Sequence, residues 1–281
     1  MKIPLPLRVS ALAIAGALAA GNAAAQTFPD FVVNEGSVTG ANPATFTADK
    51  ITGNYNEVIS FSGNTFQAAL IWDAGQFVAN DGRTPVNSQL GLLFNNQYRL
   101  YGIFQGTGTT TTSGSVTGFN FAPGGSLRIF LDPNSNTTFN APSNGGSPYT
   151  TGNSGDDILL ASGTPSSGQG TLDPNLPTCT GSSGGGSGIN CGNFGASSNF
   201  TLTSAGSSYF TSPVPFYNVS FQSGQLNNFS PTGTQSINGS LDVIFNSGGG
   251  NTGGPVPEPG TVALLGLGIL GLAAMRRSRR H

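Results

Sequence analysis

Histidine is almost absent from this 281-residue chain, because its one histidine, His281, is the last residue. Serine and cysteine nucleophile systems need an imidazole as their base. The sequence also has no glycine-rich phosphate loop between a predicted strand and a predicted helix. These absences exclude Ser-His-Asp and Cys-His catalysis and histidine metal sites, so carboxylates remain as the candidate chemical groups.

Charge is scarce as well, since Asp, Glu, Lys and Arg together form 8% of the chain. Between residues 26 and 255 lie eleven of the twelve acidic residues but only four of the ten basic ones: Lys50, Arg83, Arg99 and Arg128. A segment this acidic lacks the positive surface that binds nucleic acid, so we expect no nucleic-acid partner. Its solubility depends on abundant Gly, Ser, Thr and Asn, as is common in secreted surface proteins.

The first residues have the pattern of a secretory signal. Two basic residues precede an apolar run at 9–20, and the small residues at 23–25 offer a cleavage site before Gln26. We therefore predict a signal peptide at 1–25 that signal peptidase removes. The alternative, an uncleaved N-terminal span, fits less well because the run is short.

Cysteine is nearly absent too, with Cys179 and Cys191 as the only pair. Export to an oxidising compartment favours a disulfide between them over a metal site, because two thiols without histidine rarely hold a metal. In the loop-closure model such a bond contributes ~3 kcal/mol. We expect little of this stabilisation to reach the core, because the bond closes a glycine-rich segment.

Long helical stripes are missing from residues 26–245, where short β-rich runs alternate with Gly, Asn and Pro turns. Runs 55–61 and 65–72 predict a hairpin, and run 126–131 alternates as a half-buried strand does. The other predicted strands are 90–94, 98–104, 115–121, 156–161, 194–203, 208–211, 215–222 and 237–245. This pattern indicates an all-β fold: one β-sandwich-like domain or a related β-architecture.

Two segments, 133–154 and 163–192, contain mostly Gly, Ser, Asn, Thr and Pro. Long loops with few apolar anchors are usually mobile, so we predict flexible inserts at both places. Residues 246–254 have the composition of a flexible glycine-rich linker to the C-terminal tail.

One acidic segment has the spacing of a metal loop. Asp132, Asn134 and Asn136 alternate as the oxygen ligands of a calcium loop do, but the sixth and twelfth positions hold Thr137 and Ser143. An Asp-Pro-Asn turn after a strand explains the segment more simply.

A second acidic pair, Asp156 and Asp157, stands before a predicted strand. It fits half of a glycosidase pair, a set of calcium ligands, or a solvated strand start. With Asp73, beside Trp72, these acids would serve a carbohydrate-active or carbohydrate-binding protein that presents exposed aromatic rings. The 19 Phe residues at alternating positions are more often core. The threonine cluster at 109–112 indicates a loop rather than a flat ice-binding face.

The C-terminal tail, residues 255–281, has three parts in order. A Pro-Glu-Pro motif comes first, an uncharged apolar run follows at 262–275, and an arginine-rich end occupies 276–281. The run is shorter than the ~20 residues that a lasting transmembrane helix needs. Because basic residues stay on the cytoplasmic side, we predict a short transmembrane helix with a membrane stop at Arg276, Arg277, Arg279 and Arg280.

Pro257, Glu258 and Pro259, followed by a short apolar helix and an arginine cluster, resemble the PEP-CTERM sorting signal of Gram-negative bacteria. The resemblance implies that an exosortase, a membrane cysteine protease-transpeptidase, cuts the tail near this motif. It also implies export through the inner membrane, transient anchoring, and transfer to the cell surface or extracellular matrix. The alternative is a plain anchor that is never processed.

Several stretches of the exported domain resemble the flocculation-associated PEP-CTERM protein family. They are FPDF at 28–31, NEG at 34–36, ADKITGNYNE at 48–57, DAGQF at 73–77, YFTSP at 209–213 and SPTGTQ at 230–235. This resemblance implies an extracellular protein that helps cells aggregate with exopolysaccharide into flocs or biofilm. It brings no catalytic residues and no cofactor, so we expect a protein that is not an enzyme.

Overall fold

The computed structural model describes residues 27–91, 98–179 and 190–246, and almost all of its regular structure is β. The prediction of an all-β domain is therefore confirmed. The predicted signal peptide, the sorting tail with its helix at 262–275, and most of the linker lie outside the described residues. The same holds for residues 92–94 of the predicted strand 90–94.

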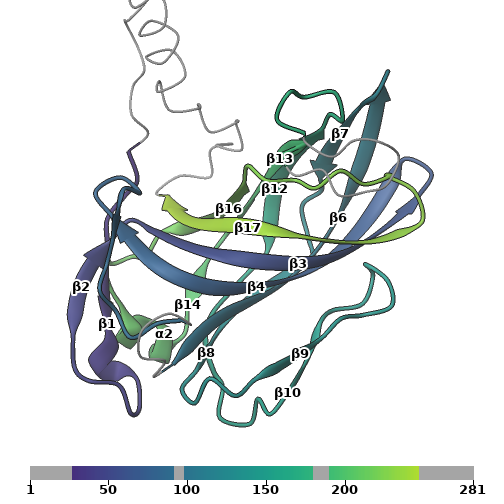
Figure 1. Ribbon diagram of the computed structural model, residues 1–281. Coiled ribbons are helices and arrows are strands. Elements are labelled where there is room, and N and C mark those ends of the chain that lie inside the picture. The colour runs from purple at the N-terminus through teal and green to yellow at the C-terminus, as the bar shows by residue number, and fades with distance from the viewer. Residues whose placement is uncertain (1–26, 92–97, 180–189, 247–281) are drawn as a thin grey trace, which may run out of the picture. The chain divides into compact units, whose positions relative to one another are not determined.

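Eight strands close into a barrel rather than into the two separate sheets of a sandwich (Figure 1). Each pairs antiparallel with the next, and the ring closes because β4 pairs with β6 as well as with β3. This closing ladder runs from Thr65 opposite Thr109 to Asp73 opposite Tyr101. In spatial order the strands are β6 (Arg99–Ser113), β7 (Val116–Phe121), β12 (Pro165–Leu172), β13 (Gly192–Ser198), β16 (Asn218–Ser223), β17 (Thr234–Asn246), β3 (Lys50–Ser62) and β4 (Thr65–Ala79).

Strand β6 is shared between the barrel and a side wall. Its second half pairs with β7, and its first half pairs with β8, which continues the sheet outward. The threonines at 109–112, expected in a loop, belong to the half that pairs with β7. The wall contains β8 (Ser126–Asp132), β11 (Ile158–Gly163) and β14 (Thr201–Leu202), and β5 (Thr84–Pro85) borders β4.

A separate three-stranded sheet is formed mainly by the start of the domain. Strand β1 lies between β2 and β15, and the short helix α2 contacts both β1 and β15. The elements are β1 (Phe31–Asn34), the 3₁₀ turn η1 (Glu35–Ser37), β2 (Thr45–Ala48), α2 (Ser204–Tyr209) and β15 (Phe210–Ser212).

Strands β3 and β4 form the predicted hairpin, and both extend beyond the predicted bounds. Ser62 pairs with Thr65, so the turn has two residues. Its first residue, Gly63, has φ 57°, a left-handed conformation that glycine takes without strain. Trp72 on β4 is 1% exposed and its indole N–H donates to the Leu241 carbonyl at 3.1 Å, so it is a core residue and not part of a sugar-binding surface.

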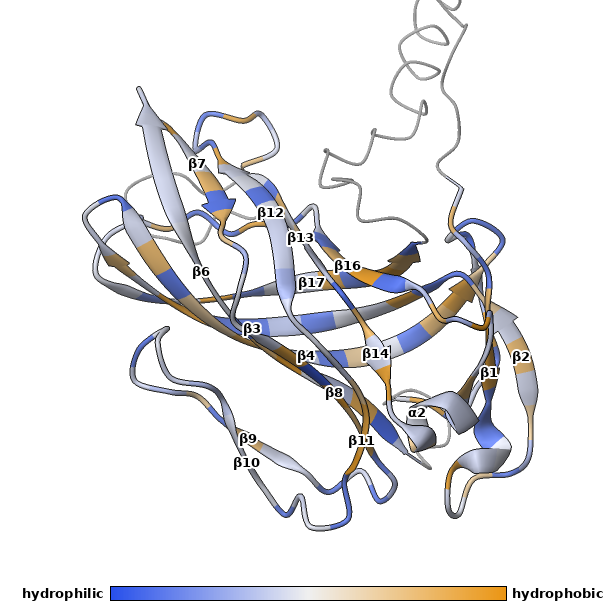
Figure 2. Cartoon of the chain, turned by 180° about the vertical axis from the view of Figure 1, so that it is seen from behind, coloured by the Kyte–Doolittle hydropathy of each residue, from blue (hydrophilic) through white to orange (hydrophobic). Residues whose placement is uncertain are grey.

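Strand β12 lies inside segment 163–192, where the composition predicts a flexible insert. Its residues are mostly pale or blue in Figure 2, so no apolar alternation marks it as a strand. A side chain at Gly168 would come within 3.0 Å of the Phe121 ring, and one at Gly170 within 2.9 Å of Phe194. Phe121 and Phe194 from the neighbouring strands therefore occupy the space inside the barrel where side chains at Gly168 and Gly170 would lie.

Segment 133–154, the other predicted insert, forms a hairpin that lies against the outside of the barrel wall. Strands β9 (Thr138–Asn140) and β10 (Thr150–Gly152) pair antiparallel and lie near β8 in both views (Figures 1 and 2). Tyr149 is 5% exposed and packs in a second apolar cluster with outward side chains of β3, β4 and β6. At the hairpin tip, a side chain on Gly145 would lie 2.0 Å from the Gln67 carbonyl oxygen, so only glycine permits this approach.

The predicted disulfide joins Cys179 to Cys191. Contrary to expectation, both residues belong to the main apolar core, where they are 6% and 0% exposed. Backbone hydrogen bonds explain the burial: the Cys191 carbonyl accepts from the Asp173 N–H, and the Cys191 N–H donates to the Leu226 carbonyl. The disulfide therefore links two segments that are both buried in the core.

Candidate functional site

A groove of about 440 Å³ lies between the outer wall, made by β6 and β8, and the β9–β10 hairpin. Sites for small organic ligands usually have ~300–1,000 Å³. The lining combines aromatic rings, hydroxyl groups and charges of both signs. Its residues are Tyr101, Ile103, Arg128, Phe130, Pro148, Tyr149, Thr150, Thr151, Ser154 and Asp157.

Side chains of β8 alternate between the core and the groove, and the outward ones form part of the groove wall. Leu127, Ile129 and Leu131 are buried in the core, as the sequence predicts, so Arg128 and Phe130 face outward. Phe130 stacks on Tyr101 of β6, with ring centroids 5.1 Å apart and an interplanar angle of 17°. The guanidinium of Arg128 lies 5.5 Å from the Phe130 ring centroid. Neighbouring strands thus present a cation and two stacked rings on one surface.

At one end of the groove the structure unites two acidic groups that lie far apart in the sequence. Carboxylate oxygens of Asp132, Asp156 and Asp157 all lie within 4.8 Å of one another. They meet because β8 and β11 pair, which brings the two ends of the intervening hairpin together. Clustered carboxylates are ligands that Ca²⁺ prefers, so these three residues are the ones that could hold a divalent cation.

Protein donors already bind each of these carboxylates. Backbone N–H groups of Asn134 and Thr137 donate to Asp132 at 3.1 and 2.9 Å. The Asn134 side chain donates to Asp156 at 2.7 Å, and the Thr137 hydroxyl donates to Asp157 at 2.8 Å. The bond from Asn134 to Asp132 is the Asp-Pro-Asn turn expected from the sequence. The acidic cluster therefore fixes both ends of the hairpin, and a cation would have to share its oxygens with these donors.

Titratable groups at this end of the groove are perturbed by burial. Burial raises the pKa of the Asp157 carboxyl, and the charges of Asp132 and Asp156 act in the same direction. The Tyr101 hydroxyl donates a short hydrogen bond to Asp157, and burial together with this bond raises the pKa of Tyr101. Perturbed groups in a cleft are typical of functional sites, so the groove is the candidate site.

Asp73, the third acid of the carbohydrate hypothesis, is paired with a base. Its two oxygens accept from the Arg99 guanidinium at 2.6 and 2.5 Å. The same guanidinium donates to the Thr137 carbonyl at 3.1 Å and lies 4.4 Å from the Phe139 ring centroid. Arg99 therefore connects the barrel wall to the hairpin, and Asp73 holds Arg99 in place.

Replacing Arg99 with alanine should loosen the hairpin. The change removes a bidentate ion pair, one bond to the hairpin backbone and one ring contact, and it leaves Asp73 partly buried without its partner. We expect a loss of about 2 kcal/mol in the free energy of unfolding. Arg99→Lys should recover only part of it, because an ammonium lacks the planar fork. Urea unfolding measures the loss, and hydrogen exchange locates it.

The control for this variant is Arg83→Ala, since Arg83 is exposed and its side chain makes no ion pair or hydrogen bond with the described residues. Exchange at 138–152 should accelerate in Arg99→Ala more than exchange in the barrel strands. Unchanged exchange in this segment would show that other contacts hold the hairpin.

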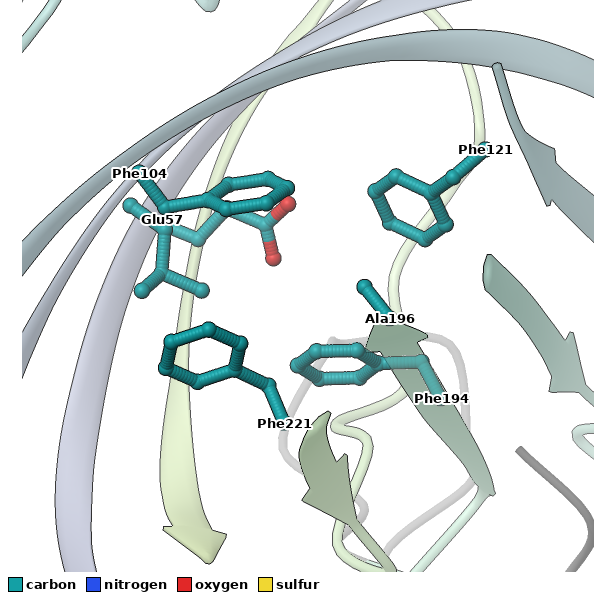
Figure 3. Close-up of a pocket in the computed structure, with 7 residues that line it drawn as sticks. Glu57, Phe104, Phe121, Phe194, Ala196 and Phe221 are labelled. Carbon is teal, nitrogen blue, oxygen red and sulfur yellow. The ribbon is translucent and has the colours of Figure 1, made fainter. Parts of the chain in front are cut away.

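The barrel interior contains a carboxyl group for which the sequence analysis assigned no role. Figure 3 shows Glu57 of β3 pointing between the rings of Phe104, Phe121, Phe194 and Phe221. It is 5% exposed, and burial raises its pKa to about 8. The adjacent cavity of about 10 Å³ has room for no more than one water, so this cavity is too small for an organic ligand. Alternation along the strand could have indicated this burial, because it places Glu57 on the same face as the apolar side chains of Tyr55 and Ile59.

Among the described residues, no helix has both the length and the apolar character needed to cross a membrane. The residues expected to act in sorting and anchoring lie beyond position 246, outside the described part of the chain.

Residues 255–280 match the PEP-CTERM protein-sorting motif. No curated protein matches the chain, and no solved structure matches it. The match covers the three-part tail predicted from Pro257, Glu258 and Pro259 onward, and it marks a secreted protein that is anchored transiently and processed by an exosortase. The chain is therefore a protein with a PEP-CTERM sorting domain.

Proposed function

We infer that this protein acts without catalysis at the cell surface or in the extracellular matrix, where it promotes flocculation or biofilm formation together with exopolysaccharide. The sorting motif at 255–280 is the observation that carries the proposal, because it marks the chain for export and exosortase processing. The neutral, Gly- and Ser-rich composition suits a matrix protein, and the mature chain lacks histidine for nucleophilic catalysis. The resemblance to flocculation-associated proteins supplies the role at that destination.

Removal of residues 257–281 tests the proposal. The truncated protein should no longer reach the surface or matrix, and its cells should flocculate less than cells with the full chain. Fractionation with an antibody to the barrel domain measures the first effect, and settling rate measures the second. A matched variant replaces Pro257, Glu258 and Pro259 with alanine and keeps the apolar run and the arginines. Normal localisation and normal settling in both variants would refute the proposal.

A second candidate function is carbohydrate binding or carbohydrate cleavage at the groove, and its aromatic wall favours this reading. Binding is better supported than cleavage. Asp132 is buried, and protein donors already bind the carboxylates of Asp132, Asp156 and Asp157, which leaves no free pair of acids for cleavage. Release of reducing ends from a polysaccharide, abolished by Asp157→Asn, would establish cleavage instead.

A further inference from the structure

The groove beside the β9–β10 hairpin differs from three other hollows in the described part of the chain. Pockets of about 350 and 240 Å³ elsewhere are lined by no charged residue, and the interior cavity beside Glu57 has about 10 Å³. The groove, at about 440 Å³, carries both a cation and a carboxylate beside aromatic rings. A ligand that fits it needs an apolar surface and several polar groups at once.

The apolar side of the groove is rigid. Phe130 is half-buried and stacks on Tyr101, while Ile103 and Tyr149 are each 5% exposed and belong to the cluster beneath the hairpin. The Phe130 ring, held by these neighbours, loses little freedom when a ligand covers its exposed part. A sugar ring offers a matching surface, because its C–H groups form an apolar face and its hydroxyls surround that face.

The polar side offers unused hydrogen-bonding capacity. Arg128 is exposed, and within the described residues its guanidinium contacts the Phe130 ring but makes no hydrogen bond or ion pair. A guanidinium has five N–H donors, so all five are available to a ligand. Asp157 receives two hydroxyl donors, and a carboxylate accepts about four. Thr150 adds an exposed hydroxyl.

The charge balance selects among saccharides. Arg128 and Asp157 line the same groove with opposite signs, so a ligand with a net charge of either sign meets one repulsive partner. The segment 26–255 as a whole has eleven acidic residues against four basic ones, so its net negative charge repels polyanions over longer distances. A neutral ligand avoids both effects.

We propose that the groove between the outer wall and the β9–β10 hairpin binds a neutral saccharide unit of a polymer. The sugar lies with its apolar face toward the exposed part of the Phe130 ring, which Ile103 and Tyr149 support from beneath, and its hydroxyls accept from Arg128 and donate to Asp157. This inference rests on the proposed function, since it specifies which class of exopolysaccharide the surface protein would hold.

Binding is measured with the protein recovered from cells that export it. The probes are a soluble neutral β-glucan, dextran and, as the polyanion, polygalacturonate, followed by calorimetry with oligosaccharides of any polymer that binds. We expect at least one neutral polymer to bind and polygalacturonate to remain unbound. Failure of every neutral probe, or preference for the polyanion, would overturn the proposal.

Two substitutions locate the site. Arg128→Gln removes the unpaired cation from an exposed position, and affinity for the neutral oligosaccharide should fall about tenfold, as for loss of a charge-assisted hydrogen bond. Thr150→Trp places a large side chain at the hairpin rim and should abolish binding. Arg83→Gln, an equal charge change at an exposed site outside the groove, should bind as the unaltered protein does. Unaltered affinity in both groove variants would rule out this groove.

Settling of cells that carry the same variants separates this inference from the proposed function. If Thr150→Trp loses saccharide binding, and cells with the full chain settle no faster than cells from which 257–281 is removed, the groove assignment stands and the role in aggregation fails. If both groove variants bind normally while removal of 257–281 abolishes settling, the role stands and the groove assignment fails.

Discussion

The protein should be markedly more stable at pH 5 than at pH 8.5, because folding buries Glu57 without a charged partner. Burial raises the pKa of this carboxyl from 4.5 to about 8. Between pH 4.5 and pH 8 the Glu57 carboxyl keeps its proton in the folded state, whereas it has lost this proton in the unfolded state. The stabilisation is therefore complete below pH 4.5 and is lost as the pH rises toward 8. Between pH 5 and pH 8.5 a shift of this size corresponds to a loss of roughly 4 kcal/mol in the free energy of unfolding.

Glu57→Gln isolates this contribution from that of the other carboxyls. The amide keeps the shape of the side chain and cannot ionise, so most of the fall between pH 5 and pH 8.5 should disappear. Asp30→Asn, at an exposed position, should leave the fall unchanged. Urea titrations of the three proteins at both pH values provide the comparison. An equal fall in the unaltered protein and in Glu57→Gln would show that this carboxyl is hydrated or already charged in the folded state.

The burial of Glu57 illustrates what the sequence predicts and what it omits. Alternation predicts strand 55–61 and places Glu57 on the face of Tyr55 and Ile59, but the pattern does not say whether that face is buried. Closure of the barrel decides it, and closure depends on the pairing of β4 with β6. The interior is then completed by Phe194 and Phe221, which come from distant strands. Such contacts lie beyond local periodicity.

The candidate groove was only partly predictable for a similar reason. Asp132 and the pair Asp156 and Asp157 were each visible as acidic groups, and the turn at Asp132 was expected. Their meeting depends on the hairpin between them, which composition alone assigned to a flexible insert. Phe139 and Tyr149 were its aromatic anchors, and two aromatic residues among many Gly, Ser and Asn residues are a weak signal. By contrast, the tail at 255–280 was predictable because its signal is contiguous.

Loss of the disulfide should destabilise the whole domain. Cys179 and Cys191 are buried in the main core, and the bond closes a loop with a sequence separation of 12. The loop-closure model gives ~3 kcal/mol for such a bond. The double variant with alanine at both positions should lose about this much in urea unfolding, and barrel strands near Cys191 should show faster hydrogen exchange.

A reductant separates the bond from the packing of the two side chains. Dithiothreitol should lower the stability of the unaltered protein and leave the double alanine variant unchanged, because that variant has no bond to break. If the bond closed a loop apart from the core, reduction would change exchange only near 179–191 and leave the unfolding midpoint in place. Because Cys191 bonds through its backbone to Asp173 and Leu226, we expect the midpoint to fall. The exported domain would then depend on the oxidising compartment to which its sorting tail directs it.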